Sequence, residues 1–101
     1  MSTPKRSPAL PDVPTIAETL PGFEAVAWFG VVAPPKTSMT IVNKINADIN
    51  EALHDPDVQT KLANLNAEVV GGTQEATAAY FRAETARWAK VIKDANVKVD
   101  Q

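Results

Sequence analysis

Residues 23–33, FEAVAWFGVVA, decide which fold class this chain can adopt. The stretch is rich in Val, Phe and Trp, lacks helical periodicity, and is bounded by Pro21-Gly22 and Pro34-Pro35. Such a run between turn residues is typical of a strand, and we expect a bend at Gly30. One strand cannot form a sheet, and isolated strand pairs are marginal in water. The strand therefore needs others, from a partner chain or from a further part of the protein.

The residues before this stretch predict an arm and one turn of helix. Four prolines, at positions 4, 8, 11 and 14, fix φ and remove backbone donors. We therefore expect residues 1–14 to form an extended Pro-rich arm. Thr15-Ile16-Ala17-Glu18 then fits a capping box, in which the Thr15 hydroxyl and the Glu18 carboxylate each bond the other's backbone N–H.

The residues after the stretch predict helices with clear starts. Thr37 or Ser38 can cap a helix with one apolar face, and Asp55-Pro56 has the form of a second helix start. The predicted face of the first helix comprises Ile41, Val42, Ile45, Ile49, Ala52 and Leu53. The second helix has an apolar stripe of Val58, Leu62 and Leu65.

The last third of the chain predicts a short strand at 67–70, a Gly71-Gly72 turn, and a long helix capped by Thr73 and running to about residue 95. Asn66 and Asn96 suit left-handed positions at helix ends, and residues 97–99 suit a last short strand. We therefore expect residues 15–101 to be an α/β segment with few strands, three to four helices and a long C-terminal helix.

Composition narrows the function classes. With 101 residues and 45% hydrophobic content the chain suits one small domain, and its formal charge of −2 argues against a nucleic-acid partner. No cysteine is present, so thiolate chemistry is excluded. No apolar run is long enough for a membrane helix, so we expect no direct membrane insertion. The first ten residues lack the apolar core of a signal peptide, which predicts no export by that route for the chain as written.

Several motifs in this order resemble the C-terminal part of the Bug (TctC-type) receptors, the solute-binding proteins of tripartite tricarboxylate transporters. The resemblance runs from about residue 5 to residue 99. It is carried by Arg6 with Leu10-Pro11-Asp12-Val13-Pro14-Thr15, by Pro21-Gly22-Phe23, Trp28-Phe29-Gly30-Val31 and Ala33-Pro34-Pro35, and later by Asp55-Pro56, Gly71-Gly72-Thr73 and Arg87-Trp88.

The resemblance implies part of one lobe of a two-lobed, type II periplasmic-binding-protein-like fold. It also implies a periplasmic location, capture of a small carboxylate, and transfer to membrane transporter subunits. The family usually has glycine where this chain has Lys36, Asn66 and Asn96, and proline where it has Ser38. The first lobe and its glycine-rich ligand loops are not represented in this chain, so we expect it to contain scaffold more than binding site.

Three residues are candidates for ligand contact. Thr15 opens a short helix whose free N–H groups could bind a carboxylate, although a capping box satisfies the same groups. Trp28 and Phe29 lie on opposite faces of the predicted strand, so one can line the interlobe cleft while the other packs in a core or interface.

Other features favour structural roles. Gly71-Gly72-Thr73 lacks the spacing of a phosphate-binding loop and is predicted to be a capped turn. Glu84 lies on an apolar helix face, and we expect it to bond a backbone amide or an arginine. With His54 as the one histidine, we expect no catalytic residue, metal site or cofactor, and no enzyme.

Three hypotheses follow. The first is a receptor fragment for tricarboxylates or dicarboxylates. The second is a self-associating interaction module that closes its open strand in a strand-completed dimer and has no ligand of its own. The third, with least support, is an enzyme fragment or regulatory domain that binds phosphate at the Gly71-Gly72-Thr73 turn.

Overall fold

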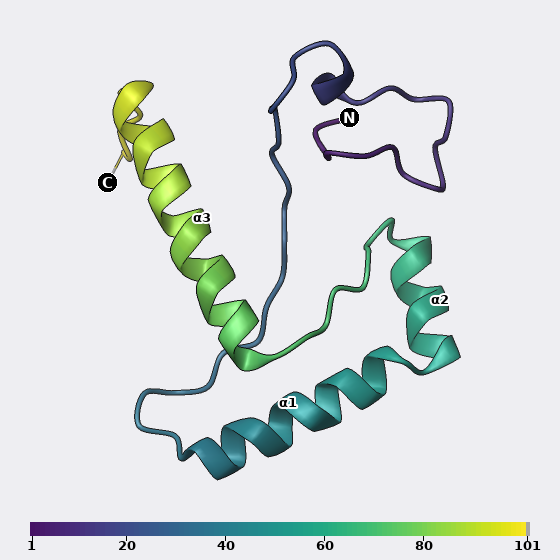
Figure 1. The fold of residues 1–101 in the computed structure, drawn as a ribbon, viewed down its shortest axis with the longest axis vertical. Helices are drawn as coiled ribbons and strands as arrows, with labels where there is room; N and C mark the ends of the chain where they lie inside the picture. Colours follow the sequence, from purple (N-terminus) through teal and green to yellow (C-terminus); the bar gives the residue numbers. More distant parts are fainter. Residues whose placement is uncertain (101) are drawn as a thin grey trace. The chain divides into compact units, whose positions relative to one another are not determined.

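The computed structural model describes residues 1–100, and its regular structure is entirely helical over that range (Figure 1). Its four elements follow the chain in the order η1, a single 3-10 turn, then α1, α2 and α3. They span Ile16–Glu18, Met39–Leu53, Pro56–Asn64 and Gln74–Asp94.

The absence of strands among residues 1–100 contradicts the predicted α/β fold class. Residues 23–33 run without helix or strand, and no backbone hydrogen bond joins Phe29–Ala33 to another described residue. The preference of Val, Phe and Trp for strands reflects packing against neighbouring strands and on a sheet face. One backbone bond, from Ala25 N–H to Ser2 O at 2.9 Å, joins this stretch to the N-terminal residues, but no ladder forms within residues 1–100, so the strand prediction was wrong.

The two shorter strand predictions were also wrong. Residues 67–70 and 97–99 contain neither strand nor bridge. Both stretches follow a helix end, where the backbone bonds back to the helix: Ala67 N–H donates to Leu62 O at 2.9 Å, and Val97 N–H donates to Ile92 O at 3.0 Å. These bonds are those of a helix C-cap, and they leave only three or four residues for any ladder.

The helix predictions were confirmed, and with them the N-caps of α1 and α3. Ser38 Oγ accepts from Ile41 N–H at 3.4 Å at the start of α1, and Pro56 is the first residue of α2. Thr73 Oγ1 accepts from Ala76 N–H at 3.1 Å at the start of α3. Past the ends of α2 and α3, Asn66 and Asn96 have positive φ of 54° and 51°, the left-handed conformation that asparagine tolerates.

The chain divides into two compact units. Unit 1 comprises Met1–Thr37 and Pro56–Val69, and so holds η1, residues 23–33 and α2. Unit 2 comprises Ser38–Asp55 and the residues from Val70 onward, and so holds α1 and α3.

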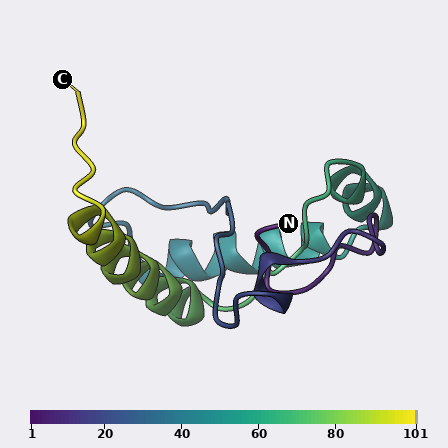
Figure 2. The ribbon, with the colours of Figure 1, turned by 90° about the horizontal axis from the view of Figure 1, so that it is seen from above.

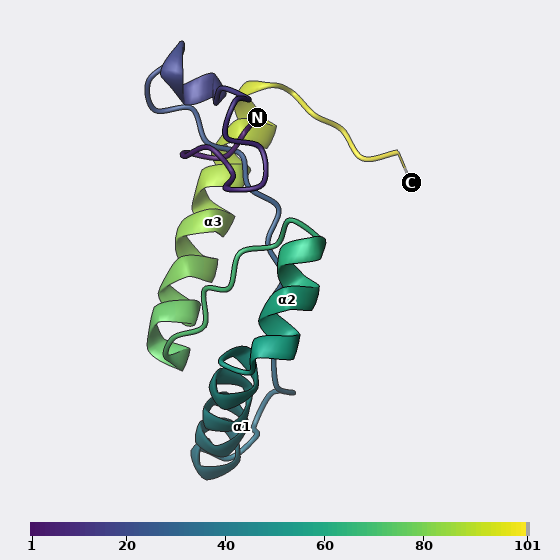
Figure 3. The ribbon, with the colours of Figure 1, turned by 90° about the vertical axis from the view of Figure 1, so that its right-hand side faces the viewer.

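In unit 2 the first turn of α3 lies beside α1, as Figures 1 and 3 show. The Gln74 side-chain amide donates to Asn43 Oδ1 on α1, which fixes this end of α3. Beyond that contact α3 runs away from α1 (Figure 1), and in the view from above α3 lies across one end of α1 (Figure 2). The two helices therefore meet at one end and do not pack along their lengths.

No hydrophobic residue among those described is fully buried. The two buried residues are polar, Thr15 at 4% exposure and Glu84 at 8%. Local polar contacts and helix caps therefore hold the elements in place. An ordinary folded domain would have a packed apolar core in addition. No described helix has the length and apolar character needed to cross a bilayer.

Candidate functional site

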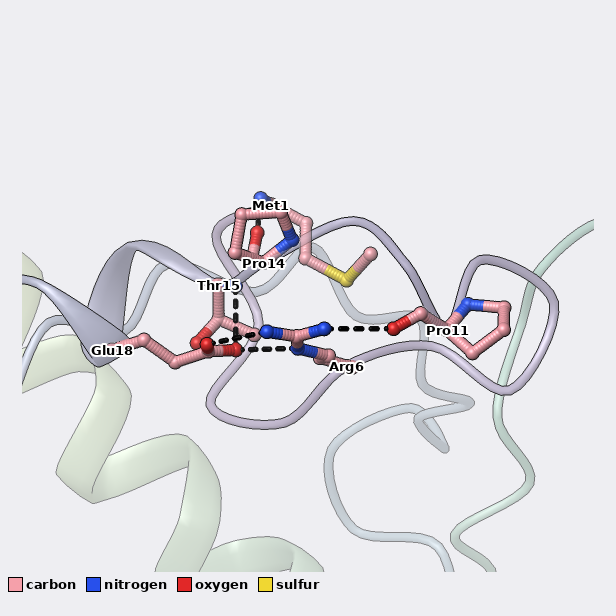
Figure 4. Close-up of polar contacts among 6 residues, drawn as sticks. All are labelled: Met1, Arg6, Pro11, Pro14, Thr15 and Glu18. Atoms are coloured by element: carbon pink, nitrogen blue, oxygen red, sulfur yellow. Dashed lines mark hydrogen bonds and ion pairs between the residues drawn. The ribbon is translucent and has the colours of Figure 1, made fainter.

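Thr15 lies at the centre of a set of polar contacts that we call the N-terminal knot, made by Met1, Arg6, Pro11, Pro14, Thr15 and Glu18 (Figure 4). The predicted capping box is present, with Thr15 N–H donating to Glu18 Oε1 at 3.1 Å. Around it, the Met1 amino group donates to Pro14 O at 2.8 Å, and Ile16 N–H donates to Met1 O at 2.9 Å. The loop of residues 1–14 is therefore closed onto the start of η1.

Arg6 completes the knot, a role that the sequence analysis did not assign. Its Nε and Nη2 donate to the two carboxylate oxygens of Glu18, each at 2.7 Å, and its Nη1 donates to Pro11 O at 3.0 Å. This two-pronged geometry matches the guanidinium fork to a carboxylate. The hydrogen bonds from Arg6, and then that from Thr15 N–H, lower the pKa of Glu18 to about 2.

The knot determines what Thr15 can offer a ligand. The Thr15 N–H, one donor that a carboxylate could have used, is bonded to the carboxylate of Glu18. The chain thus places an internal carboxylate at the position where an external one was predicted. A ligand could reach the Thr15 N–H only by displacing Glu18 from both Arg6 and Thr15.

Trp28 and Phe29 lie in the segment of residues 23–33, which we call the aromatic segment. The Trp28 side chain is half-exposed at 41%, whereas Phe29 is 97% exposed. Val31 and Val32 follow at 70% and 72%. Phe29 is thus almost fully open to solvent and Trp28 only partly so.

The Gly71-Gly72 turn is held by a residue that the sequence analysis missed. Asn50 Oδ1 accepts from Gly72 N–H at 2.9 Å, while Asn50 Nδ2 donates to Gly72 O at 2.8 Å and to Asn46 O at 2.9 Å. Gly71 has φ of +61°, and a Cβ on it would lie 2.8 Å from Asn50 Oδ1. We call Asn50, Gly71 and Gly72 the glycine clamp. The turn and its Thr73 cap are therefore present as predicted. The bond to Asn50 also occupies the Gly72 N–H, a donor that an anion bound at this turn would need.

Glu84 has the arginine partner that was predicted. Arg87 Nη1 donates to one carboxylate oxygen at 3.0 Å, and Trp88 Nε1 donates to the other at 3.0 Å. The Arg87 guanidinium also lies 5.2 Å from the centre of the Trp88 ring, within cation–π range. The buried carboxylate is therefore paired along its own helix and has the contacts of a structural group.

A small hollow in unit 1 offers little to a carboxylate ligand. Its volume is about 160 Å³, well below the several hundred typical of ligand pockets. It is lined by Ser7, Pro8, Ala9, Ala63, Asn66, Ala67 and Glu68. The only charged side chain, Glu68, would repel a carboxylate. Within residues 1–100, no three His, Cys, Asp or Glu side chains gather as a metal site would require.

Comparison with known proteins gives a family match over nearly the whole chain. Residues 1–97 match the model of the tripartite tricarboxylate transporter family receptor. A protein of Pseudomonas sp. strain P51, named for the tcbD-tcbE intergenic region, is 45% identical over 98 residues. A second, of Pseudomonas knackmussii, named for the clcB-clcD intergenic region, is 40% identical over 88 residues, and protein BugT of Bordetella pertussis is 38% identical over 95.

The match covers much more of this chain than of its relatives. It takes in 95% of this chain but 29% of the strain P51 protein, and 93% of this chain but 29% of BugT. For the Pseudomonas knackmussii protein the shares are 85% and 52%. The chain therefore spans between about three tenths and one half of the length of these relatives.

Proposed function

Because this chain belongs to the tripartite tricarboxylate transporter receptor family, we propose that it is the C-terminal part of a receptor that captures a small carboxylate, of the tricarboxylate or dicarboxylate type. The single observation that carries the proposal is the family match over residues 1–97. The similarity to BugT supports the same assignment.

The geometry gives the candidate residues different parts in this proposal. Phe29 and Trp28 would contact the apolar carbon skeleton of the ligand, because both side chains are accessible. Thr15 would contribute its N–H only if the ligand carboxylate displaced Glu18, so its contribution is smaller. The charged groups that select one carboxylate would then come from the rest of the receptor.

Citrate titration of the purified chain, followed by thermal unfolding, tests the proposal. A ligand that binds only the folded state adds about 1.4 kcal/mol to its stability at ten times its Kd. We expect a saturable rise in Tm with citrate and none with its neutral trimethyl ester. Phe29→Ala should reduce the rise, whereas Val99→Ala, at another exposed apolar position, should not. No rise with citrate, succinate or malate would overturn carboxylate capture by this chain.

The proposal also assigns a location and a transport partner. In the intact receptor this segment would lie in the periplasm, and the receptor would present its ligand to the membrane subunits of the transporter. We assign it no catalytic step. Receptors of this family are solute-binding proteins, which is a non-enzymatic class. Fractionation of cells that express a full-length relative tests the location, and recovery of that relative in the cytoplasm would contradict it.

A second candidate function is self-association without a ligand. It is favoured by one observation, the exposure of Phe29, Val31 and Val32 at 97%, 70% and 72%. Light scattering over a micromolar concentration series tests it. A dimer that Phe29→Glu dissociates would support self-association, and a monomer at all concentrations would exclude it.

A further inference from the structure

The hollow of unit 1 combines apolar walls with an unpaired carboxylate. It lies between the N-terminal loop and the end of α2, and most of its lining is apolar, from Pro8, Ala9, Ala63 and Ala67. The carboxylate of Glu68, which also lines the hollow, is exposed and has no hydrogen bond or ion pair with another of residues 1–100. This combination suits a ligand that has an apolar body and a positive charge.

The end of α2 adds negative charge at the same place. The last carbonyls of a helix carry a partial negative charge, which favours a cation beside the final turn. Ala63, in the final turn of α2, lines the hollow. The basic residue of that turn, Lys61, pairs with Asp57 at 2.8 Å, one turn back toward the start of the helix. None of the lining residues is basic, so no lining side chain neutralises the negative charge at the hollow.

The size of the hollow limits what can enter it. Its volume of about 160 Å³ is close to the roughly 150 Å³ of an engineered apolar cavity that accepts one benzene molecule. Drug-sized ligands need pockets of several hundred cubic ångströms. A single six-membered ring, or a short chain of similar volume, is therefore the largest apolar body that the hollow can hold.

We propose that this hollow binds a small organic cation, namely an ammonium group on an apolar body of about six carbon atoms. The ammonium group would lie beside the Glu68 carboxylate and the end of α2, and the body would contact Pro8, Ala63 and Ala67. A carboxylate does not suit the same position, because Glu68 would repel it. The proposal rests on unit 1 alone and stands whether or not this chain captures a carboxylate.

Titration of the isotope-labelled chain with cyclohexylamine, followed by amide chemical shifts in NMR spectra, tests the proposal. The amine is protonated at neutral pH, as other alkylamines are. We expect saturable shifts of the amides of Ala63, Ala67 and Glu68, with a Kd on the order of 1 mM for a ligand of this size. Cyclohexanol, which has a similar shape but no charge, should bind about three- to fivefold more weakly, and cyclohexanecarboxylate should leave these amides unshifted.

Glu68→Gln keeps the shape of the side chain and removes its charge. Because a partly exposed ion pair contributes little, we expect the Kd for cyclohexylamine to rise about three- to fivefold. Glu51→Gln is the matched control: Glu51 is also an exposed carboxylate near the end of a helix, α1, but it belongs to unit 2 and does not line the hollow. It should leave the Kd unchanged.

Ala63→Leu tests the location of the site, because the larger side chain would fill the hollow and should abolish the shifts. Ala63 is exposed and leucine is a good helix former, so the variant should keep the helical circular dichroism of the original chain. Any of four results would overturn the proposal: no shift of these amides at amine concentrations far above the expected Kd, equal affinity for cyclohexanol, an unchanged Kd in Glu68→Gln, or undiminished binding to Ala63→Leu.

Discussion

The N-terminal knot and the aromatic segment belong to the same unit and are both almost free of regular secondary structure, yet they differ in how they are held. In the knot, each charged group has a partner: Arg6 bonds both oxygens of Glu18 at 2.7 Å, and Thr15 N–H bonds the same carboxylate. In the aromatic segment, Phe29 to Ala33 have no backbone hydrogen bond to any of residues 1–100, and Phe29 is 97% exposed.

The difference shows which interactions a short chain can complete alone. Hydrogen bonds and caps are satisfied by a few residues close in sequence, so the knot closes without a core. Apolar side chains are stabilised only when enough other surface covers them, and no apolar side chain among residues 1–100 is fully covered.

The largest effect should come from Gly71→Ala in the glycine clamp. The new Cβ would lie 2.8 Å from Asn50 Oδ1, at a residue with φ of +61°, so it would disrupt the bonds to Gly72 as well as strain the backbone. We expect a loss of about 3 kcal/mol in the free energy of unfolding, from strain and two lost hydrogen bonds. Urea unfolding followed at 222 nm measures it.

Gly22→Ala is the control for that experiment. Gly22 has φ of +86° but no heavy atom within 4 Å of an added Cβ. Its cost should be limited to backbone strain, about 1 kcal/mol. Equal losses for the two variants would show that the clamp contributes nothing beyond the glycine conformation.

The next effect concerns the charge pairing of the knot. The pKa of Glu18 is lowered to about 2, chiefly by its hydrogen bonds from Arg6. A carboxylate with a lowered folded-state pKa contributes stability above its unfolded pKa, and this stability is lost as the pH falls from about 4.3 to about 2. Arg6→Met should return the Glu18 pKa toward about 4, as measured by NMR titration of its side chain.

Lys44→Met is the control for the titration, because Lys44 pairs with Asp48 on α1 and has no contact with Glu18. It should leave the pKa of Glu18 near 2. An ordinary pKa for Glu18 in the unaltered chain would mean that the knot does not form in solution.

A smaller gain is expected from Lys36→Gly. Lys36 has φ of +67°, a left-handed conformation that costs a side-chain-bearing residue about 1–2 kcal/mol and costs glycine almost nothing. Since glycine also loses more backbone freedom on folding, the net gain should be about 0.5–1 kcal/mol. Denaturant unfolding measures it, and a loss of stability would show that Lys36 makes contacts that outweigh its strain.

The smallest effect on stability should follow Phe29→Ser in the chain alone. Because Phe29 is 97% exposed, we expect a change below about 0.5 kcal/mol, the range of ordinary surface substitutions. A loss above about 1 kcal/mol would mean that Phe29 packs within this chain, and the contrast with the knot would fail.

Local signals explain why the helices could be predicted. Ser38, Pro56 and Thr73 mark helix starts through their own side chains, and Asn66 and Asn96 mark the helix ends. The physical cause of each boundary lies within a few residues, so the sequence alone was sufficient.

The strands and two of the partners could not be predicted for the opposite reason. A strand depends on a ladder with a second segment, and within residues 1–100 the stretch 23–33 has one backbone bond to the N-terminal residues, from Ala25 N–H to Ser2 O, and no ladder. Asn50 and Gly72 are 22 residues apart, and Arg6 and Glu18 are 12 apart. One sign was available for Asn50: with Asn46 it lies on the half-buried face of α1 formed by Val42, Ile49 and Leu53, where an amide needs a partner.

Amide hydrogen exchange distinguishes the two regions in solution, because the backbone of Phe29 to Ala33 has no hydrogen bond within residues 1–100 while the amides of Thr15 and Ile16 donate to acceptors in the knot. In the chain alone, the amides of Phe29 to Ala33 should exchange at rates close to those of an unfolded peptide, while those of Thr15 and Ile16, which donate hydrogen bonds, should exchange more slowly. Strong protection of Phe29 to Ala33 in the isolated chain would contradict the account, because it would show that these amides already have partners.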